Sequence, residues 1–212
     1  MADDQRSSSS SMSAMASQIC NQISSVFSRA IQNPSVHSIA VEEISAAVNR
    51  KGRVFVHGVG REGLMLKALC MRLSHLGLSA HCVGDMTTPP ISSSDLLIAS
   101  AGPGGFSTVD AICGVARSNG ARVLLFTAQP ESGSATRYAT AIGFIPAQTM
   151  ADDDDAAAHH GSKEDEDRRE LLPMGSVYEG AMFVLFEMIV FELGQILGQT
   201  PNAIRSRHTN LE

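Results

Sequence analysis

The spacing with the clearest chemical meaning in this sequence is a glycine triplet, Gly58-x-Gly60-x-x-Gly63, after a short apolar run. In dinucleotide-binding folds this spacing turns a strand sharply into a helix whose N-terminus holds a pyrophosphate. Asp85 follows Gly63 at about the distance, some 20 residues, at which an acid binds the ribose of NAD. Taken alone, the triplet favours a nucleotide site, and a tight turn that binds nothing through its glycines is the alternative.

A second glycine-bearing segment, Ser100-Ala-Gly-Pro-Gly-Gly105, weighs against the NAD interpretation. A nucleotide-binding fold usually begins near its fingerprint strand, yet the first triplet stands well inside the chain, and such a fold has no special need for the second loop. The two loops together favour a different kind of ligand.

The elements around both loops alternate between strand and helix. Strands are expected at 53–57, 79–83, 95–99, 122–127 and 141–145, and helices at 19–30, 35–49, 64–76, 107–118 and 174–197. This order predicts an α/β fold, a three-layer α-β-α sandwich with a five-stranded parallel sheet. Ligands of such sheets bind outside the carboxyl ends of the strands, where both glycine loops fall.

Composition limits the organisation and the partners of the chain. Its 212 residues suit one ordinary domain. Residues 1–16 are expected to form a disordered Ser-rich tail, 17–212 a single domain, and 151–170 an acidic disordered loop within it. That loop holds nine acidic and three basic residues, hence −6, which equals the net charge of the whole chain. The remainder is formally neutral, so we expect no nucleic-acid partner.

No apolar run is long enough to span a membrane, and the start lacks the pattern of a secretory signal or transit peptide. The four cysteines include no C-x-x-C pair, which is typical of a reducing compartment. We therefore expect no membrane partner and a cytoplasmic location. The pair His159-His160 lies in the acidic loop, which cannot pre-form a metal site, and no metal is expected.

An ordered set of short motifs resembles the 6-phospho-3-hexuloisomerase branch of the sugar isomerase (SIS) family. It comprises Val56-His-Gly-Val-Gly-Arg-Glu-Gly63, Met71-Arg-Leu-Ser-His-Leu-Gly77, Gly84-Asp-Met-Thr-Thr-Pro89, Asp95-Leu-Leu-Ile98, Thr127-Ala-Gln-Pro130, Pro173-Met-Gly-Ser-Val-Tyr-Glu179 and Arg207-His-Thr-Asn-Leu-Glu212. The resemblance covers about 17–148 and 172–212. It implies a flavodoxin-like SIS fold, a homodimer or homotetramer, and a phosphorylated sugar as substrate.

The reaction implied by the resemblance converts 3-hexulose 6-phosphate to fructose 6-phosphate through an enediolate, with no cofactor. Glu179 matches the acid of the family motif P-x-G-x-x-x-E and is the implied catalytic base. His208 matches the family ending R-H-x-N-L, and its imidazole is the implied second catalytic group, which in related enzymes commonly reaches a neighbouring subunit's site.

Substrate-binding residues are expected at the ends of three strands. Gly60 and Arg61 follow the first strand, Asp85, Thr87 and Thr88 follow the second, and Ser100, Gly102, Gly104, Gly105 and Ser107 follow the third. Arg61 would hold substrate hydroxyls or stabilise the enediolate, and a surface arginine is the alternative.

The phosphate-binding loop departs from the family pattern. The family grips phosphate with the hydroxyls of S-x-S-x-x-T and a serine in G-R-S-G. Here only Ser100 matches, because Gly102 and Gly105 replace the other two hydroxyls and Glu62 replaces the serine. We expect weaker or altered phosphate recognition. A non-catalytic sugar-phosphate-binding protein is therefore the main alternative function, and an NAD-binding oxidoreductase a distant one.

Overall fold

The computed structural model describes residues 2–28, 33–149, 172 and 174–211. Its centre is a parallel sheet with the strand order β2-β1-β3-β4-β5. The strands are β1 (Val54–His57), β2 (Ala80–Cys82), β3 (Leu96–Ser100), β4 (Arg122–Thr127) and β5 (Ala141–Phe144). All five lie within or next to the predicted strands, and every neighbouring pair is parallel. The predicted fold class is confirmed.

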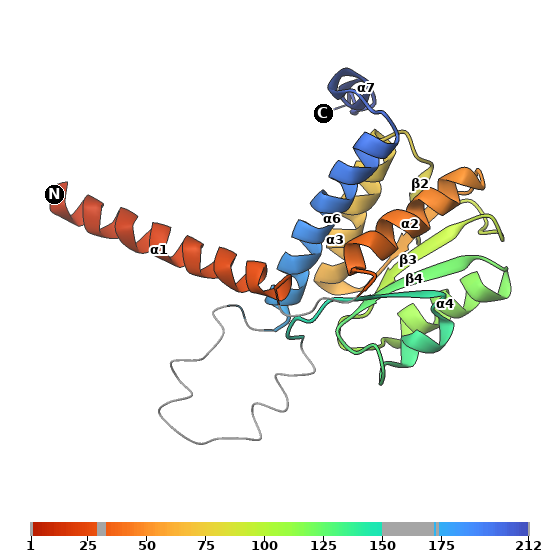
Figure 1. Cartoon of the computed structure of the whole chain (residues 1–212), viewed down its shortest axis with the longest axis horizontal. Coiled ribbons are helices and arrows are strands. Elements are labelled where there is room, and N and C mark those ends of the chain that lie inside the picture. The colour runs from red at the N-terminus through yellow and green to blue at the C-terminus, as the bar shows by residue number, and fades with distance from the viewer. Residues whose placement is uncertain (1, 29–32, 150–171, 173, 212) are drawn as a thin grey trace.

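Helices cover both faces of this sheet, which gives three layers (Figure 1). On one face lie α2 (Val36–Asn49), α3 (Gly60–His75) and α6 (Ser176–Ile196); on the other lie α4 (Ser107–Ser118) and the short 3-10 helix η1 (Ser134–Tyr138). Alternate strand side chains supply each face: Val54 and Val56 pack in the first core, and Phe55 in the second. Because β3 is buried along its whole length, it reads in the sequence as a continuous apolar run.

At both ends of the described chain, helices cover residues that lie outside the predicted helices. The Ser-rich start, predicted as a disordered tail, belongs to α1 (Ala2–Val26), which extends away from the body of the molecule (Figure 1). No glycine or proline interrupts that stretch, so the helix that packs at its C-terminal part can continue backward. Near the other end, α7 (Pro201–Ser206) begins at the N-cap Thr200 with proline in its first turn.

The predicted acidic loop, 151–170, lies outside the described residues, so its disorder stays a prediction. Within the described ranges, no helix has the length and apolar character needed to cross a membrane.

Candidate active site

The site is built where β1 and β3, neighbours in the sheet, reach their carboxyl ends. The strand order reverses direction here, since β2 lies on one side of β1 and β3, β4 and β5 follow on the other. The first turns of α3 and α6 meet at this edge, where an ion pair joins Arg61 of α3 to Glu179 of α6. Residues far apart in the sequence thereby form one cluster.

The glycine triplet makes the turn from β1 into α3. Gly60 has a φ of +56°, which favours glycine, and it opens the helix. A Cβ atom on Gly63 would lie 2.5 Å from the backbone oxygen of Gly58, so the strand and the helix can approach this closely only without a side chain there. The helix therefore begins at Gly60, earlier than predicted. The triplet's spacing is explained by this turn without a nucleotide.

Glu62 has a different environment from the one the sequence suggested. Its side chain is buried, and its carboxylate accepts a hydrogen bond of 2.5 Å from the Ser100 hydroxyl. The backbone N–H of Gly102 lies 3.0 and 3.2 Å from the two carboxylate oxygens. Burial raises the pKa of Glu62, although the hydrogen bonds from Ser100 and Gly102 act in the opposite direction. Glu62 thus binds the loop after β3 directly.

Gly102 leaves the space that this arrangement needs. A Cβ atom at this position would lie 3.1 Å from a carboxylate oxygen of Glu62 and 3.1 Å from the ring of Tyr178. The Tyr178 hydroxyl lies 3.3 Å from the Ser100 hydroxyl, and its ring is buried. Tyr178 is a site residue that sequence reasoning missed, although it stands beside Glu179 in a quoted motif.

Glu179 occupies the first turn of α6, with little of its side chain exposed. Its Oε2 atom lies 3.1 Å from Nη2 of Arg61 as an ion pair, but without the alignment of a hydrogen bond. Burial raises the pKa of Glu179 to about 7; Arg61 lowers it and the nearby Glu62 raises it further. A carboxylate with a pKa near neutrality suits a general base.

Arg61 is fixed by more than this pair. Its Nη1 atom donates a hydrogen bond of 2.7 Å to the Ser176 hydroxyl, and Nη2 donates to the backbone oxygen of Met174. The guanidinium therefore bridges the start of α3 and the start of α6. About half of its side chain remains exposed, at 48%, so it can still reach a ligand.

The predicted residues after β2 form a local turn. The Thr88 hydroxyl donates to the backbone oxygen of Cys82 at 2.7 Å, and the backbone N–H of Thr88 donates to Asp85. Asp85 and Thr87 are exposed. Among the described contacts, none joins these residues to Glu179 or Arg61, so the structure leaves their predicted role as a prediction.

The glycines after β3 pack against the segment that follows β4. A Cβ atom on Gly105 would lie 2.0 Å from the Ser134 hydroxyl oxygen, and Gly104 has a φ of +100°. A threonine at 105, as in the family pattern, would therefore require the Ser134 hydroxyl to move. Ser107 is exposed at the start of α4. Its hydroxyl is available at the correct edge of the sheet.

Within its own chain, His208 lies far from the predicted site. Its ring stacks on His75, with centroids 5.2 Å apart, and His75 is the last residue of α3. Arg61 is at the first turn of that 16-residue helix, which is about 24 Å long. Within one chain, the structure therefore does not bring His208 to Glu179, because α7 follows the C-terminal end of α6.

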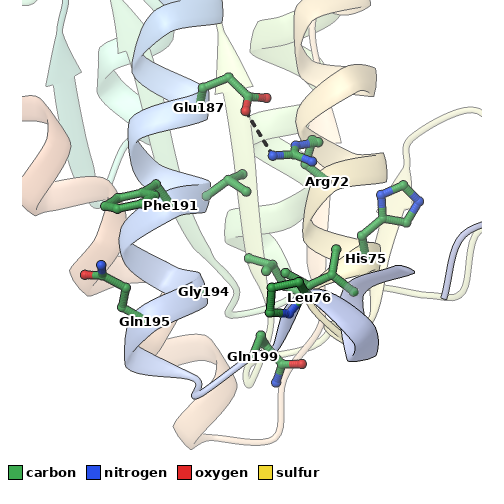
Figure 2. Close-up of a pocket in the computed structure, with 11 residues that line it drawn as sticks. Arg72, His75, Leu76, Glu187, Phe191, Gly194, Gln195 and Gln199 are labelled. Carbon is green, nitrogen blue, oxygen red and sulfur yellow. Dashed lines mark hydrogen bonds and ion pairs between the residues drawn. The ribbon is translucent and has the colours of Figure 1, made fainter. Parts of the chain in front are cut away.

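That far end holds a groove of about 540 Å³ between α3, α6 and α7 (Figure 2). Figure 2 shows Arg72 and Glu187 paired across it, with His75 and Gln199 also lining the groove. The ion pair joins Nη2 of Arg72 to Oε2 of Glu187 at 2.9 Å. The groove is well separated from Glu179, which lies at the opposite end of α6. It does not belong to the candidate active site.

One further polar group was missed at the carboxyl end of β1. The Nε2 atom of His57 is buried without a hydrogen-bond partner, and burial lowers the pKa of this imidazole. No cluster of three or more potential metal ligands occurs in the part of the chain that the structure describes.

No family model matches the sequence. The chain is 35% identical over 172 residues to the 3-hexulose-6-phosphate isomerase of Mycobacterium gastri, covering 81% of this chain and 80% of the relative. It is 31% identical to the enzyme of the same name from Bacillus subtilis, over 76% and 80% of the two chains.

A solved structure from Methanococcus jannaschii, from which a 3-hexulose-6-phosphate isomerase function was inferred, superposes with a TM-score of 0.71 at 24% identity. The superposition covers 94% of this chain and 99% of that one. At this level of identity the structural match establishes the shared fold.

Proposed function

The chain belongs to the 3-hexulose-6-phosphate isomerase branch of the sugar isomerase (SIS) family, and from this premise we propose that it isomerises a sugar phosphate. The proposed reaction converts 3-hexulose 6-phosphate to fructose 6-phosphate. The observation that carries the proposal is Glu179, a carboxylate with a pKa of about 7 beside the Arg61 guanidinium. It lies at the sheet edge where such folds bind ligands.

In the proposed mechanism, ionised Glu179 removes the proton from C2 of the substrate, next to the C3 carbonyl. The resulting enediolate spans C2 and C3, and its negative charge is stabilised by Arg61. Protonated Glu179 then returns the proton to C3. The hydroxyl proton of O2 leaves as the C2 carbonyl forms, and O3 gains one. This chemistry requires one base and one cation near two adjacent carbons.

We propose that His208 moves the proton between the two oxygens in the site of a partner subunit, since it is remote from Glu179 in its own chain. A homodimer or homotetramer is therefore part of the proposal. Large apolar side chains on the outer face of α6 support it: Phe183 is 55% and Phe191 69% exposed. Neighbouring residues of α6 and His37 line an open apolar groove of about 700 Å³.

A non-catalytic sugar-phosphate-binding protein is the second candidate. The observation that favours it is the carboxylate of Glu62, which occupies the loop after β3. Binding of fructose 6-phosphate without any turnover would support this candidate over the isomerase.

Direct measurement of turnover tests the proposal. Wild-type protein is expected to form fructose 6-phosphate from 3-hexulose 6-phosphate, and Glu179→Gln to lose about 10²–10⁴-fold in kcat, because the amide cannot accept the proton. Glu42→Gln, at an exposed carboxylate on α2, is the matched control and should keep full activity. Absence of product at high concentrations of wild-type protein would rule out the isomerase.

A further inference from the structure

The loop after β3 has its hydrogen-bond donors occupied by the chain itself. The Ser100 hydroxyl and the Gly102 N–H both point at Glu62, at 2.5 Å and 3.0 Å. Hydroxyl and backbone N–H donors at the end of a buried strand are the groups that hold an anion in such folds. In this protein, the anion they hold is a side-chain carboxylate.

The carboxylate is built into the loop and is not a mobile surface group. Glu62 is only 6% exposed, and the space for it depends on Gly102, where a Cβ atom would crowd both Glu62 and Tyr178 at 3.1 Å. Tyr178 is itself buried, and its hydroxyl lies 3.3 Å from the Ser100 hydroxyl. A serine at 102, which would offer a hydroxyl to a ligand, would require this carboxylate and the Tyr178 ring to move by a few tenths of an ångström.

The guanidinium of Arg61 already has partners within its own chain. Arg61, the neighbour of Glu62 in the sequence, pairs with Glu179 and donates to Ser176 and Met174. Within the described residues, Glu62 forms no ion pair. Two carboxylates and one guanidinium therefore share this edge of the sheet, and an incoming dianion would meet repulsion there.

We propose that Glu62 is a specificity-determining residue that competes with a ligand phosphate for the donors of Ser100 and Gly102. The phosphate of a sugar phosphate then binds more weakly at this loop than it would if both donors were free. For the identity of the ligand, the inference rests on the proposed function. The contacts of Glu62 themselves do not depend on it.

Titration with inorganic phosphate, followed by calorimetry and thermal shift at neutral pH, tests this role. Glu62→Ala frees both donors and removes the charge, so it is expected to bind phosphate at least about tenfold more tightly than wild type. Glu62→Gln removes the charge but keeps an acceptor, and its affinity should lie between the two. Glu187→Ala removes one negative charge far from the loop and should match wild type.

Equal phosphate affinity of wild type and Glu62→Ala would overturn the inference, as would no binding by Glu62→Ala. A gain of the same size in Glu187→Ala would also overturn it, since net charge alone would then explain the result. If Glu62→Ala lacks a cooperative thermal transition, Glu62→Gln decides, and a wild-type affinity for that variant overturns the inference. Phosphate binding needs no turnover, so failure of the isomerase assay is a separate result.

Discussion

At the scale of single residues, the neighbouring carboxylates of Glu62 and Glu179 have different environments. Glu62 is held by two hydrogen-bond donors, whereas Glu179 faces Arg61 in an ion pair and lines the more open part of the cluster. Burial raises the pKa of both, and the nearby Glu62 raises the pKa of Glu179 further. The carboxylate with fixed partners suits a structural or selecting role, and the other can exchange a proton.

The pH dependence of the proposed reaction should report Glu179. As a base, Glu179 acts in its ionised form. We therefore expect kcat/KM to be constant at pH values above its pKa of about 7, and to fall about tenfold per pH unit below it. The raised pKa also means that the folded chain binds more protons than the unfolded chain between about pH 4.5 and 7. This residue therefore makes the folded state less stable as the pH rises through that window.

Arg61→Met tests the origin of that pKa. The Arg61 charge lowers the pKa of Glu179, so its removal should move the falling limb of the pH profile to higher pH. Arg50→Met is the matched control, because Arg50 is exposed at the C-terminal end of α2, donates to the backbone oxygen of Ser94, and should leave the profile in place. If the pH profile of Arg61→Met matches that of the wild type, the decrease in kcat/KM at low pH is due to a group other than Glu179.

Glu179, Arg61 and Ser100 could be predicted from the sequence as candidate site residues, because each stands in a short motif. It also identified Glu62 and Gly102 as departures from the family pattern, but treated them as separate losses. Their relationship depends on a contact between residues 40 positions apart in the chain. No local sequence pattern encodes such a contact. The hydrogen bonds from the loop after β3 to the Glu62 carboxylate could therefore not be predicted before the fold was known.

At the scale of elements, the turn from β1 into α3 places both Arg61 and Glu62. Alternation of strand and helix was predictable, since buried parallel strands give short apolar runs bounded by glycine. The start of α3 was predicted four residues late because glycines usually argue against a helix. Here the positive φ of Gly60 and the close approach of Gly63 to Gly58 allow the helix to begin inside the triplet.

The two glycines of α3 are expected to respond differently to alanine. Gly63→Ala would place its Cβ 2.5 Å from a backbone oxygen, which cannot yield easily, and should lower the free energy of unfolding by about 3 kcal/mol. Gly60→Ala meets nothing within 4 Å and is strained only by its φ, which costs about 1 kcal/mol. Urea denaturation of both variants measures this difference, and equal losses would contradict the proposed close approach.

At the scale of the whole molecule, the C-terminal segment has a defined place that its polar sequence did not predict. Arg207 donates to the backbone oxygen of His75 at 3.0 Å and to the Gln199 side chain at 2.8 Å, and it packs under Gly77. These contacts hold α7 and His208 at the far end of α3 (Figure 1). A catalytic role for His208 therefore requires a second copy of the chain.

Mixing two inactive variants tests that arrangement. Glu179→Gln and His208→Ala, co-expressed with different tags, can form a mixed dimer in which one site combines an intact Glu179 with an intact His208 from the partner. With random pairing, about half of the dimers are mixed and one of the two sites in each mixed dimer is intact. About a quarter of all sites, and hence about a quarter of wild-type activity, should therefore be recovered. If His208 acted within its own chain, every site would lack one group and no activity would return.

Co-expression of Glu179→Gln with Arg61→Met is the control. Both of those residues belong to the same chain's cluster, so each site receives either one substitution or the other and no such recovery is expected.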